Sequence, residues 1–464
     1  MERVNPATGE ALDPIEADDE TAVEEALSTA EETFASWRDA PLSEREELLA
    51  NAADVLRENR DEYAELMTTE MGKPLAAARS EVEKCAWVCD YYAEHASEHL
   101  QDERIGAEPG VDSFVAYEPL GPILAVMPWN FPFWQVFRFA APHLTSGNVG
   151  LLKHASNVPG CAAAIEDVFR EAGYPDGVFQ TLLVGSDAVD DVIEDERVKA
   201  VTLTGSEHAG RAVAETAGAE LKKTVLELGG SDPFVVFDDA DIAAAAETGA
   251  RARTINSGQS CIAAKRFIVH EAVYDEFVDA FVAEMAALDV GDPTDDVDLG
   301  PQARADLMHD LHDQVERSVA AGATVELGGD PLDRDGFFYP PTVLTDVPRD
   351  SAVADEEVFG PVAPVFEVAD EAGAIALAND TDLGLGGSVW TADRERGTRV
   401  AREIESGAVF VNELTKSDPR LPFGGIGDSG YGRELGEMGI HEFVNRKTIW
   451  VQDAEMPEDG PAGE

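Results

Sequence analysis

Basic residues are scarce in this chain. Its 464 residues include 34 Lys and Arg against 93 Asp and Glu, which gives a formal net charge of −59. A surface of this sign repels nucleic acid and anionic membranes, so we expect neither as a partner. The acidic residues are spread along the chain and are not confined to a tail. An ordinary soluble acidic protein is one explanation. We favour adaptation to a salt-rich cytoplasm, where ions at 1 M screen charges beyond about 3 Å.

Cysteines and long apolar runs are also few. The four cysteines are too scattered for a disulfide framework, which favours a reducing, cytoplasmic environment. The first twenty residues are polar and acidic, unlike a signal peptide. The most apolar region, 119–144, is interrupted by prolines, Asn130 and Arg138, so we expect no membrane span.

The spacing of apolar residues predicts an α/β protein with two or more domains. Residues 21–60 and 79–98 have helical spacing. From residue 148, strand-like runs such as VGLLKH and VKAVTLTGS alternate with helix-like runs, a pattern typical of a parallel sheet. A second alternating block begins near residue 230. Because parallel sheets bind ligands beyond the carboxyl ends of their strands, we expect functional residues there.

Glu227 is a carboxylate in an apolar setting, the stretch LELGG at 226–230. A buried carboxylate must be paired, neutralised or used in chemistry. Apolar surroundings raise the pKa of an acid, which makes its ionised form a better base near neutral pH. Glu227 is therefore a candidate general base, if its sequence neighbours are also its spatial neighbours.

Cys261 ends the stretch NSGQSC and is a candidate nucleophile. The residues after it are compatible with a helix, and a thiol at a helix N-terminus has its thiolate favoured. An inert buried cysteine is the alternative. Cys85 and Cys89 stand four residues apart on a predicted helix, but no His or Cys pair accompanies them, which indicates core packing and not a metal site.

Three further signals are weak individually. Asn130 lies in MPWNFP, where two prolines restrict the backbone, and its amide suits either an oxyanion or a turn. Gly205 and Ser206 open a strand-to-helix turn that lacks the full G-x-G-x-x-G order. This turn either offers N–H groups to a phosphate or simply needs glycine. Lys153 ends a strand, where it contacts a ribose or phosphate or extends its charge to the surface.

Together, five stretches occur in a specific order and spacing: PWNFP (128–132), LELGG (226–230), GQSC (258–261), EEVFGPV (356–362) and PFGGIGDSGYGRE (422–434). They make the chain resemble the NAD(P)-dependent aldehyde dehydrogenase superfamily over nearly its whole length. Within that superfamily, LLKHASNVPGCAAAIEDVF and CIAAKRF are most similar to the succinate-semialdehyde dehydrogenases.

The resemblance implies a role for each matching residue. Cys261 would be the nucleophile, Asn130 the oxyanion donor, and Glu227 the base that activates water to hydrolyse a cysteine thioester. The cofactor, NAD or NADP, would be bound by Trp129, Lys153, Ser156, Gly205, Ser206, Leu228, Glu357 and Phe359. No metal is implied. Strict NAD users often carry glutamate where Ser156 stands, so we expect NADP to be accepted.

The resemblance also implies a fold of two parallel-sheet α/β domains and a small oligomerisation sheet, in a homodimer or homotetramer. The expected ranges are 1–103 and 118–228 for the cofactor-binding domain, 229–433 for the catalytic domain, 104–117 and 434–452 for the oligomerisation arm, and 453–464 for an acidic tail. Gly427 and Asp428 stand where this family often has lysine, a change to which we assign little consequence for catalysis.

Glu227 also distinguishes between two kinds of enzyme. Relatives that transfer the acyl group to coenzyme A lack this glutamate, so its presence favours release of a free acid. Oxidation of another small aldehyde remains an alternative. A catalytically silent relative is disfavoured because Cys261, Glu227 and Asn130 are all retained.

Arg138 is the main candidate for binding the far end of the substrate. It lies among aromatic and aliphatic residues in PWNFPFWQVFR, where a charge needs a definite partner. Semialdehyde dehydrogenases carry an arginine at the matching place, and its fork grips a carboxylate with two hydrogen bonds. A surface salt bridge is the alternative. Ser417 and Arg420 are weaker candidates for the same pocket.

Overall fold

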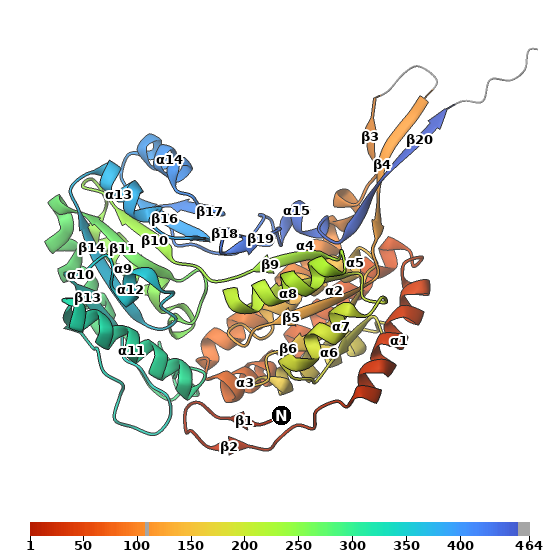
Figure 1. Ribbon diagram of the computed structural model, residues 1–464, viewed down its shortest axis with the longest axis horizontal. Coiled ribbons are helices and arrows are strands. Elements are labelled where there is room, and N and C mark those ends of the chain that lie inside the picture. The colour runs from red at the N-terminus through yellow and green to blue at the C-terminus, as the bar shows by residue number, and fades with distance from the viewer. Residues whose placement is uncertain (107–110, 453–464) are drawn as a thin grey trace, which may run out of the picture.

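The computed structural model describes residues 1–106 and 111–452. The chain forms two lobes, each built around its own sheet, and an arm that projects from the first lobe (Figure 1). The predicted tail at 453–464 and residues 107–110 of the predicted arm lie outside the described residues. Among the helices in the described ranges, none is both long and apolar enough to cross a membrane.

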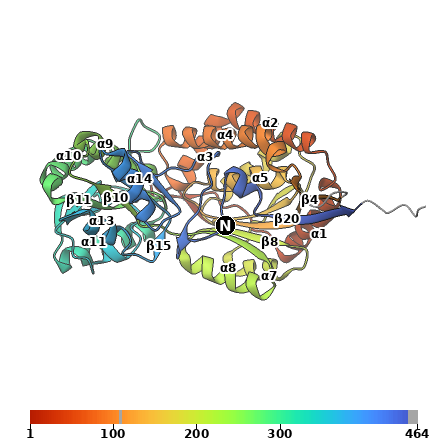
Figure 2. The ribbon, with the colours of Figure 1, turned by 90° about the horizontal axis from the view of Figure 1, so that it is seen from above.

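The first lobe contains a six-stranded sheet in the order β19-β9-β8-β5-β6-β7. Its strands are β5 (Pro122–Met127), β6 (Val149–His154), β7 (Phe179–Thr181), β8 (Ala200–Thr204), β9 (Lys223–Glu227) and β19 (Gly430–Tyr431). Its helices are α1 (Glu20–Trp37), α2 (Leu42–Glu58), α3 (Arg60–Met71), α4 (Leu75–His99), α5 (Trp134–Thr145), α6 (Pro159–Glu171), α7 (Val189–Glu194) and α8 (Glu207–Ala219). Helices α2 to α5 lie on one side of this sheet and α7 and α8 on the other (Figure 2).

The second lobe contains a seven-stranded sheet in the order β12-β13-β14-β11-β10-β16-β17. Its strands are β10 (Asp232–Val236), β11 (Ala264–His270), β12 (Thr324–Leu327), β13 (Thr342–Thr345), β14 (Val362–Val368), β16 (Gly386–Trp390) and β17 (Ala408–Val411). Its helices are α9 (Ile242–Thr254), α10 (Tyr274–Ala286), α11 (Ala305–Ala321), α12 (Ala352–Asp355), α13 (Glu371–Ala378) and α14 (Arg394–Glu403).

Alternation of side chains on β10 and β11 explains how the second sheet buries both faces. Phe234 and Phe267 pack in one apolar cluster with residues of α9 and α10. Val235 and Ile268, one position further along each strand, pack in another cluster with residues of α11, α13 and α14. Helices therefore cover both sides of this sheet, as is usual for parallel strands.

The arm is an antiparallel sheet in the order β20-β4-β3, formed by β3 (Glu103–Ile105), β4 (Val111–Pro119) and β20 (Val444–Gln452). Its register pairs Val444 with Pro119 at one end and Gln452 with Val111 at the other. The remaining elements are short: β1 (Arg3–Val4), β2 (Ala11–Leu12), β15 (Leu383–Gly384), β18 (Ile426–Gly427), α15 (Gly436–Ile440) and 3-10 turns at Ser186–Ala188, Ile255–Gly258 and Glu271–Val273.

The α/β class is confirmed, with three differences of detail. Each large sheet has one antiparallel edge strand, β19 beside β9 and β12 beside β13, so neither is wholly parallel. The predicted helical region 21–60 is divided between α1, α2 and the first residue of α3, with Pro41 standing just before α2. Proline has no N–H to continue a helix, which explains the break. Helix α11 was not anticipated from the apolar pattern.

Candidate active site

Two cavities meet at Cys261, between the two sheets. The Trp129 cavity, of about 180 Å³, is lined by the loops after β5, β8 and β9, and by Cys261, Glu357 and Phe359. The Phe423 cavity, of about 110 Å³, is also lined by Cys261, together with residues of α4, α5 and the segment 414–417. Because Cys261 borders both spaces, a group bound in one can react with a group bound in the other.

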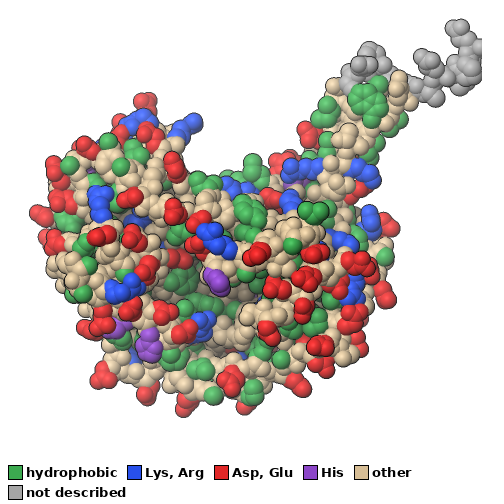
Figure 3. All heavy atoms as spheres, viewed as in Figure 1, with side chains coloured by type: hydrophobic (Ala, Val, Ile, Leu, Met, Phe, Trp, Pro, Cys, Tyr) green, Lys and Arg blue, Asp and Glu red, His purple; other side chains and the backbone are tan. Residues whose placement is uncertain are grey.

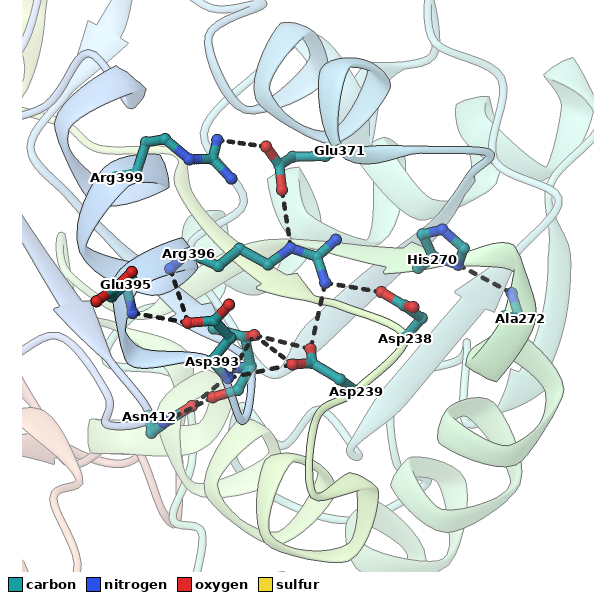
Figure 4. Close-up of polar contacts among 11 residues, drawn as sticks. Asp238, Asp239, His270, Ala272, Glu371, Asp393, Glu395, Arg396, Arg399 and Asn412 are labelled. Atoms are coloured by element: carbon teal, nitrogen blue, oxygen red, sulfur yellow. Dashed lines mark hydrogen bonds and ion pairs between the residues drawn. The ribbon is translucent and has the colours of Figure 1, made fainter.

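The two sheets contribute opposite ends of their strands to the site. The first sheet contributes residues at the carboxyl ends of its strands, where the sequence pattern predicted function. Cys261 comes before β11, however, and the loop of Glu357 and Phe359 comes before β14, so the second sheet contributes its amino ends. A charged cluster around Arg396 lies at the other end of the second sheet, where Asp238 follows β10 and Glu371 follows β14 (Figure 4).

Cys261 follows a backbone segment in a rare conformation. Asn256, Ser257 and Gly258 have φ values of 54°, 56° and 78°, in the left-handed region. A Cβ on Gly258 would lie 2.2 Å from the backbone carbon of Gly360, so this position requires glycine. Left-handed non-glycine residues store strain that the surrounding structure must hold, and they often occur at functional sites.

The expected helix N-terminus at Cys261 is wrong. The helix-compatible residues after it form a turn that leads into β11. Burial raises the pKa of the Cys261 thiol to about 12, although the Lys265 ammonium acts in the opposite direction. The resting group is therefore a thiol and not a favoured thiolate, because desolvation outweighs the nearby positive charge. The other three cysteines are fully buried, as core packing predicts for Cys85 and Cys89.

Glu227 is buried at the end of β9, and neither oxygen of its carboxyl group has a hydrogen-bond partner among the described residues. Burial, reinforced by the neighbouring Glu434 carboxylate, raises its pKa well above the ordinary value, whereas Arg138 opposes the rise. A Cβ on Gly424 would lie 2.7 Å from Glu227 Oε1, so glycine there leaves room for the carboxyl group. Glu227 is thus buried, as its sequence neighbours suggested, but its surroundings include the charged groups of Glu434 and Arg138 and are not simply apolar. It lines neither of the two cavities at Cys261.

The Asn130 amide is held in a defined orientation at the junction of the lobes. Its Nδ2 donates to the Gln259 carbonyl at 3.1 Å, and Asn256 Nδ2 donates to the Asn130 carbonyl at 2.7 Å. An amide nitrogen carries two hydrogens, so one remains for another acceptor. Asn256 was not singled out in the sequence. Its unusual backbone conformation cannot be read from residue type alone.

The predicted cofactor residues fall into two groups. Trp129, Gly205, Ser206, Leu228, Glu357 and Phe359 line the Trp129 cavity. The rings of Trp129 and Phe359 meet edge to face at 5.8 Å, and the Gly230 N–H donates to Glu357 Oε1 at 3.0 Å. Lys153 and Ser156 do not line this cavity. They lie at the carboxyl end of β6, beside β5 and therefore along the same edge of the sheet.

The turn at Gly205 fits a ligand better than it fits a purely structural role. Its φ is not left-handed, and a Cβ there would meet only Leu203, at an ordinary 3.6 Å. Neither strain nor packing within the protein requires glycine, and the open space suits close approach of a phosphate. Ser206 caps the 13-residue helix α8 by accepting from the Ala209 N–H at 3.3 Å. The described residues thus fit a dinucleotide.

The structure separates the predicted substrate residues. Arg138 and Ser417 line the Phe423 cavity. Arg138 is buried there and forms an ion pair with Glu434, so its salt bridge is internal and not on the surface. Its contact with a substrate stays a prediction. Arg420 does not line the cavity. It is exposed and paired with Asp418 at 2.6 Å, an exposed arrangement that leaves its charge outside the pocket.

Lys84 is a cavity residue that the sequence reasoning missed. It extends from α4 into the Phe423 cavity, where its Nζ donates to Ser417 Oγ at 2.7 Å and lies 4.2 Å from the centre of the Trp134 ring. Lysine is rare in this chain, with nine against 25 arginines. A lysine within the apolar spacing of a predicted helix was the available signal.

The chain is similar in sequence and in structure to several known proteins. The family model described as the aldehyde dehydrogenase family matches residues 1–449. A Synechocystis protein named as a probable succinate-semialdehyde dehydrogenase (NADP+) is 54% identical, over 97% of this chain and 99% of its own. Succinate-semialdehyde dehydrogenase (NADP+) 1 of Mycobacterium bovis is 53% identical, over 97% and 99%. The structure of succinic semialdehyde dehydrogenase from Streptococcus pyogenes with NADP+ has a TM-score of 0.95 at 39% identity, over 97% and 100%.

Proposed function

The chain belongs to the aldehyde dehydrogenase family, and on that basis we propose that it oxidises succinate semialdehyde to succinate with NADP+, accepting NAD+ as well. The observation that carries the proposal is the Phe423 cavity beside Cys261. Three cations, Lys84, Arg138 and Lys416, line it, and no Asp or Glu is among the described residues that do so. In a chain with a net charge of −59, such a cavity favours an anionic aldehyde.

Cys261 supplies the nucleophile. Its thiol loses its proton to solvent water, and the thiolate sulfur then forms a bond to the aldehyde carbon. The carbon–oxygen π bond breaks, and the carbonyl oxygen becomes an oxyanion. The free hydrogen of the Asn130 amide and the backbone N–H of Cys261 stabilise that oxygen. NADP+, when bound in the Trp129 cavity, supplies the hydride acceptor. Loss of hydride from the carbon leaves an acyl group attached to Cys261 as a thioester.

Glu227 completes the reaction by taking a proton from water. The hydroxide equivalent adds to the thioester carbon, the carbon–sulfur bond breaks, and Cys261 leaves as a thiolate or thiol. The high pKa that burial imposes makes the ionised Glu227 a stronger base than an exposed glutamate. Hydrolysis releases a free carboxylic acid, in contrast to transfer of the acyl group to another thiol.

The nucleotide is held at the edge of the first sheet. Ser206 and the N-terminus of α8 lie at the cavity, with N–H groups that suit a phosphate. Lys153 is largely buried, and burial lowers its pKa from the ordinary value. Ser156 is exposed three residues later and brings no carboxylate that would repel a 2′-phosphate. These features support acceptance of NADP+.

The arm supports assembly into a homodimer or homotetramer. β20 is an edge strand of nine residues, and Trp450 and Val451 on it are more than half exposed. An exposed edge strand of this kind offers unpaired N–H and C=O groups that are suited to pairing with another chain. We assign 104–117 and 434–452 to this arm, 1–103 and 118–228 to cofactor binding, and 229–433 to catalysis, noting that β19 joins the first sheet.

The cellular setting that we propose is a salt-rich cytoplasm. Acidic side chains are scattered over the visible face of both lobes and are not gathered in one patch (Figure 3). All four cysteines are free, which suits a reducing compartment.

A substrate panel tests the proposed function. Succinate semialdehyde and butanal are assayed with NADP+ and NAD+ at low and high KCl, following formation of the reduced cofactor. We expect the highest kcat/KM with succinate semialdehyde and NADP+. Equal or better use of butanal would contradict the substrate assignment while leaving the family assignment intact.

A further inference from the structure

Lys265 is a buried cation beside the nucleophile. It lies on β11, four residues after Cys261, and only 1% of its side chain is exposed. A buried ammonium is costly unless it is paired and hydrogen-bonded, so a charge in this position needs definite partners. The partners of Lys265 therefore indicate what its charge does.

Three contacts surround the Lys265 ammonium. Its Nζ donates to the Cys261 carbonyl at 2.6 Å and to the Ser260 carbonyl at 2.9 Å, and it lies 3.2 Å from Glu357 Oε1. An ammonium has three N–H groups, and these three contacts occupy them. Lys265 therefore acts on other parts of the protein and does not bind a ligand directly.

Glu357 connects Lys265 with the Trp129 cavity, which Glu357 lines. Its Oε1 lies against Lys265 and accepts from the Gly230 N–H, whereas its Oε2 makes no hydrogen bond with the described residues. The side chain of Glu357 is 26% exposed, against 1% for Lys265. Solvent therefore screens the carboxylate more than the ammonium, and the positive charge near Cys261 is only partly cancelled.

A second buried cation holds the same segment. Arg253 donates to the Gly258 carbonyl at 2.8 Å and to the Ala264 carbonyl at 2.9 Å, on either side of Cys261. Lys265 holds the carbonyls in the middle of that segment. Three successive left-handed residues come just before it and store strain, so the segment needs such contacts to keep its shape. Of the two cations, only Lys265 also contacts a carboxylate of the Trp129 cavity.

We propose that Lys265 is a positioning residue that ties the main chain of Cys261 to Glu357 at the Trp129 cavity and supplies the fixed positive charge that stabilises the thiolate. This inference rests on the proposed function, since it concerns the nucleophile of that reaction. The tether fixes the main chain that carries both the thiol and the N–H of the oxyanion site. The charge lowers the free energy of forming a thiolate in a buried position.

The charged groups that face the Cys261 thiol act on its pKa in two directions. Lys265, and then Arg138, lower the pKa of the thiol, whereas Glu357 and Asp232 raise it. Burial raises the pKa of Asp232 itself to about 6, so its charge is present above that pH. Lys265 has the largest effect of the four groups. Removing its charge should therefore raise the pKa of the thiol, and removing the charge of Glu357 should lower it.

Lys265→Met, which keeps the length of the side chain and removes the ammonium, is the direct test. The rate of alkylation by iodoacetamide, measured at about pH 8 without cofactor or aldehyde and assigned to Cys261 by mass spectrometry, reports the thiolate fraction. A nearby opposite charge lowers a pKa by about 1 to 3, and a thiolate of higher pKa is more nucleophilic, which offsets about half of the change in rate. We therefore expect the rate to fall by about 3- to 30-fold.

Glu357→Gln is the second test, and its result separates a charge effect from loss of structure. The variant keeps the shape of the side chain and removes the negative charge beside Lys265, so alkylation of the cofactor-free enzyme should become about threefold faster. Loosening of the Cys261 segment would change the rates of both variants in the same direction, whereas a charge effect changes them in opposite directions. Changes in the same direction, or an unchanged rate in Lys265→Met, would overturn the inference.

Lys222→Met is the matched control. The Lys222 ammonium also donates to backbone carbonyls, those of Ile193 and Asp195, but Lys222 lies just before β9, at the amino end of that strand. We expect its alkylation rate to equal that of the wild type, and a loss as large as that in Lys265→Met would overturn the inference. A thermal melt of each variant identifies misfolding. If Lys265→Met does not fold, Glu357→Gln still decides, because an unchanged or slower rate there contradicts the proposed balance of charges.

The alkylation assay also separates this inference from the proposed function, because it contains no aldehyde. If the wild type prefers butanal in the substrate panel but the two variants shift the alkylation rate in opposite directions, the proposed substrate is wrong and the role of Lys265 stands. If the wild type prefers succinate semialdehyde but the alkylation rate of Lys265→Met equals that of the wild type, the proposed function stands and the role of Lys265 is refuted.

Discussion

Each large sheet holds a charged cluster at the carboxyl ends of its strands, and the two clusters differ in character. In the second sheet, Arg396 contacts Asp238 at 2.7 Å and Glu371 at 2.8 Å, and Asp393 caps α14 (Figure 4). In the first sheet, Glu227 at the end of β9 is buried and has no hydrogen-bond partner among the described residues. The first cluster is partly exposed and its charges are matched, whereas the second is buried and incompletely matched.

The pKa shifts of the carboxyl groups have opposite directions in the two clusters. A hydrogen bond from Arg396 lowers the pKa of Asp238, and hydrogen bonds from Arg399 and Arg396 lower that of Glu371. Burial raises the pKa of both Glu227 and Glu434. Matched charges stabilise the fold, while a buried group without partners costs folding free energy and is available for chemistry. Substitutions in the Arg396 cluster should therefore affect stability, whereas substitution of Glu227 should affect activity.

Removal of the nucleophile should have the largest effect. We expect Cys261→Ala to reduce aldehyde oxidation to background while NADP+ binding, followed by fluorescence titration, stays nearly intact. The thiol borders the Trp129 cavity but only the reaction needs its sulfur. Substantial turnover by the purified, folded variant would refute the assignment of Cys261.

Glu227→Gln should rank next, with steady-state turnover falling by about 10²- to 10⁴-fold, the usual contribution of a general base. Gln has nearly the same shape and is neutral, so it should be tolerated in a site where burial already favours the uncharged acid. Only thioester hydrolysis should be lost. Rapid mixing should therefore show a burst of NADPH close to the enzyme concentration and then a stall. If the burst disappears with the turnover, Glu227 acts at an earlier step.

Ser156→Glu introduces a new carboxylate at the edge of the first sheet. Repulsion of the 2′-phosphate should shift the ratio of kcat/KM for NADP+ over NAD+ towards NAD+ by about tenfold, equivalent to 1.4 kcal/mol. Ser206 provides a comparison site, since it caps α8 and lines the Trp129 cavity. An unchanged ratio in Ser156→Glu would show that the 2′-phosphate is read elsewhere.

Salt should act on the exposed surface far more than on the buried site. Self-repulsion among 93 acidic residues is screened at high ionic strength, so Tm should rise by several degrees across a KCl series. Thermal melts at a fixed pH measure this effect. A flat profile would contradict the proposed adaptation to salt.

Arg396→Met should have the smallest effect and should change only the stability of the fold. Loss of exposed ion pairs should lower the free energy of unfolding by about 1 kcal/mol near neutral pH, with kcat/KM unchanged. The pKa values of Asp238 and Glu371 are lowered in the fold, so their stabilising effect is present above their ordinary pKa values and is lost as the pH falls through the lowered ones. The difference from wild type should therefore shrink in acid.

Arg394→Met is the control for this comparison. Arg394 lies on the same helix and makes no ion pair with the described part of the chain. Denaturant titrations of both variants at neutral and acidic pH give the required differences. If the loss in Arg396→Met persists in acid, or matches that in Arg394→Met, the cluster does not stabilise the fold through its charges.

The specific spacing of the sequence motifs selects Cys261, Glu227 and Asn130 as catalytic candidates, and their roles stay a prediction. Motifs could not reveal that Cys261 precedes a strand, since the residues after it are compatible with either element. They also could not reveal its raised pKa, which depends on burial by distant segments. Lys84 and Ser417 come from opposite halves of the chain and meet only in the folded protein. The ion pair of Arg138 with Glu434 could not be read from the sequence for the same reason, because the two residues are distant in the chain.

The most direct test of the contrast between the two clusters is the titration of Glu227 itself. Infrared difference spectra between wild type and Glu227→Gln isolate the carbonyl band of one protonated carboxyl group over a range of pH. The account predicts that the band from Glu227 persists at about pH 6, well above the range of an exposed glutamate, because the group is buried without partners. Loss of the band with a midpoint at about pH 4.3 would show an ordinary carboxylate and would contradict the account.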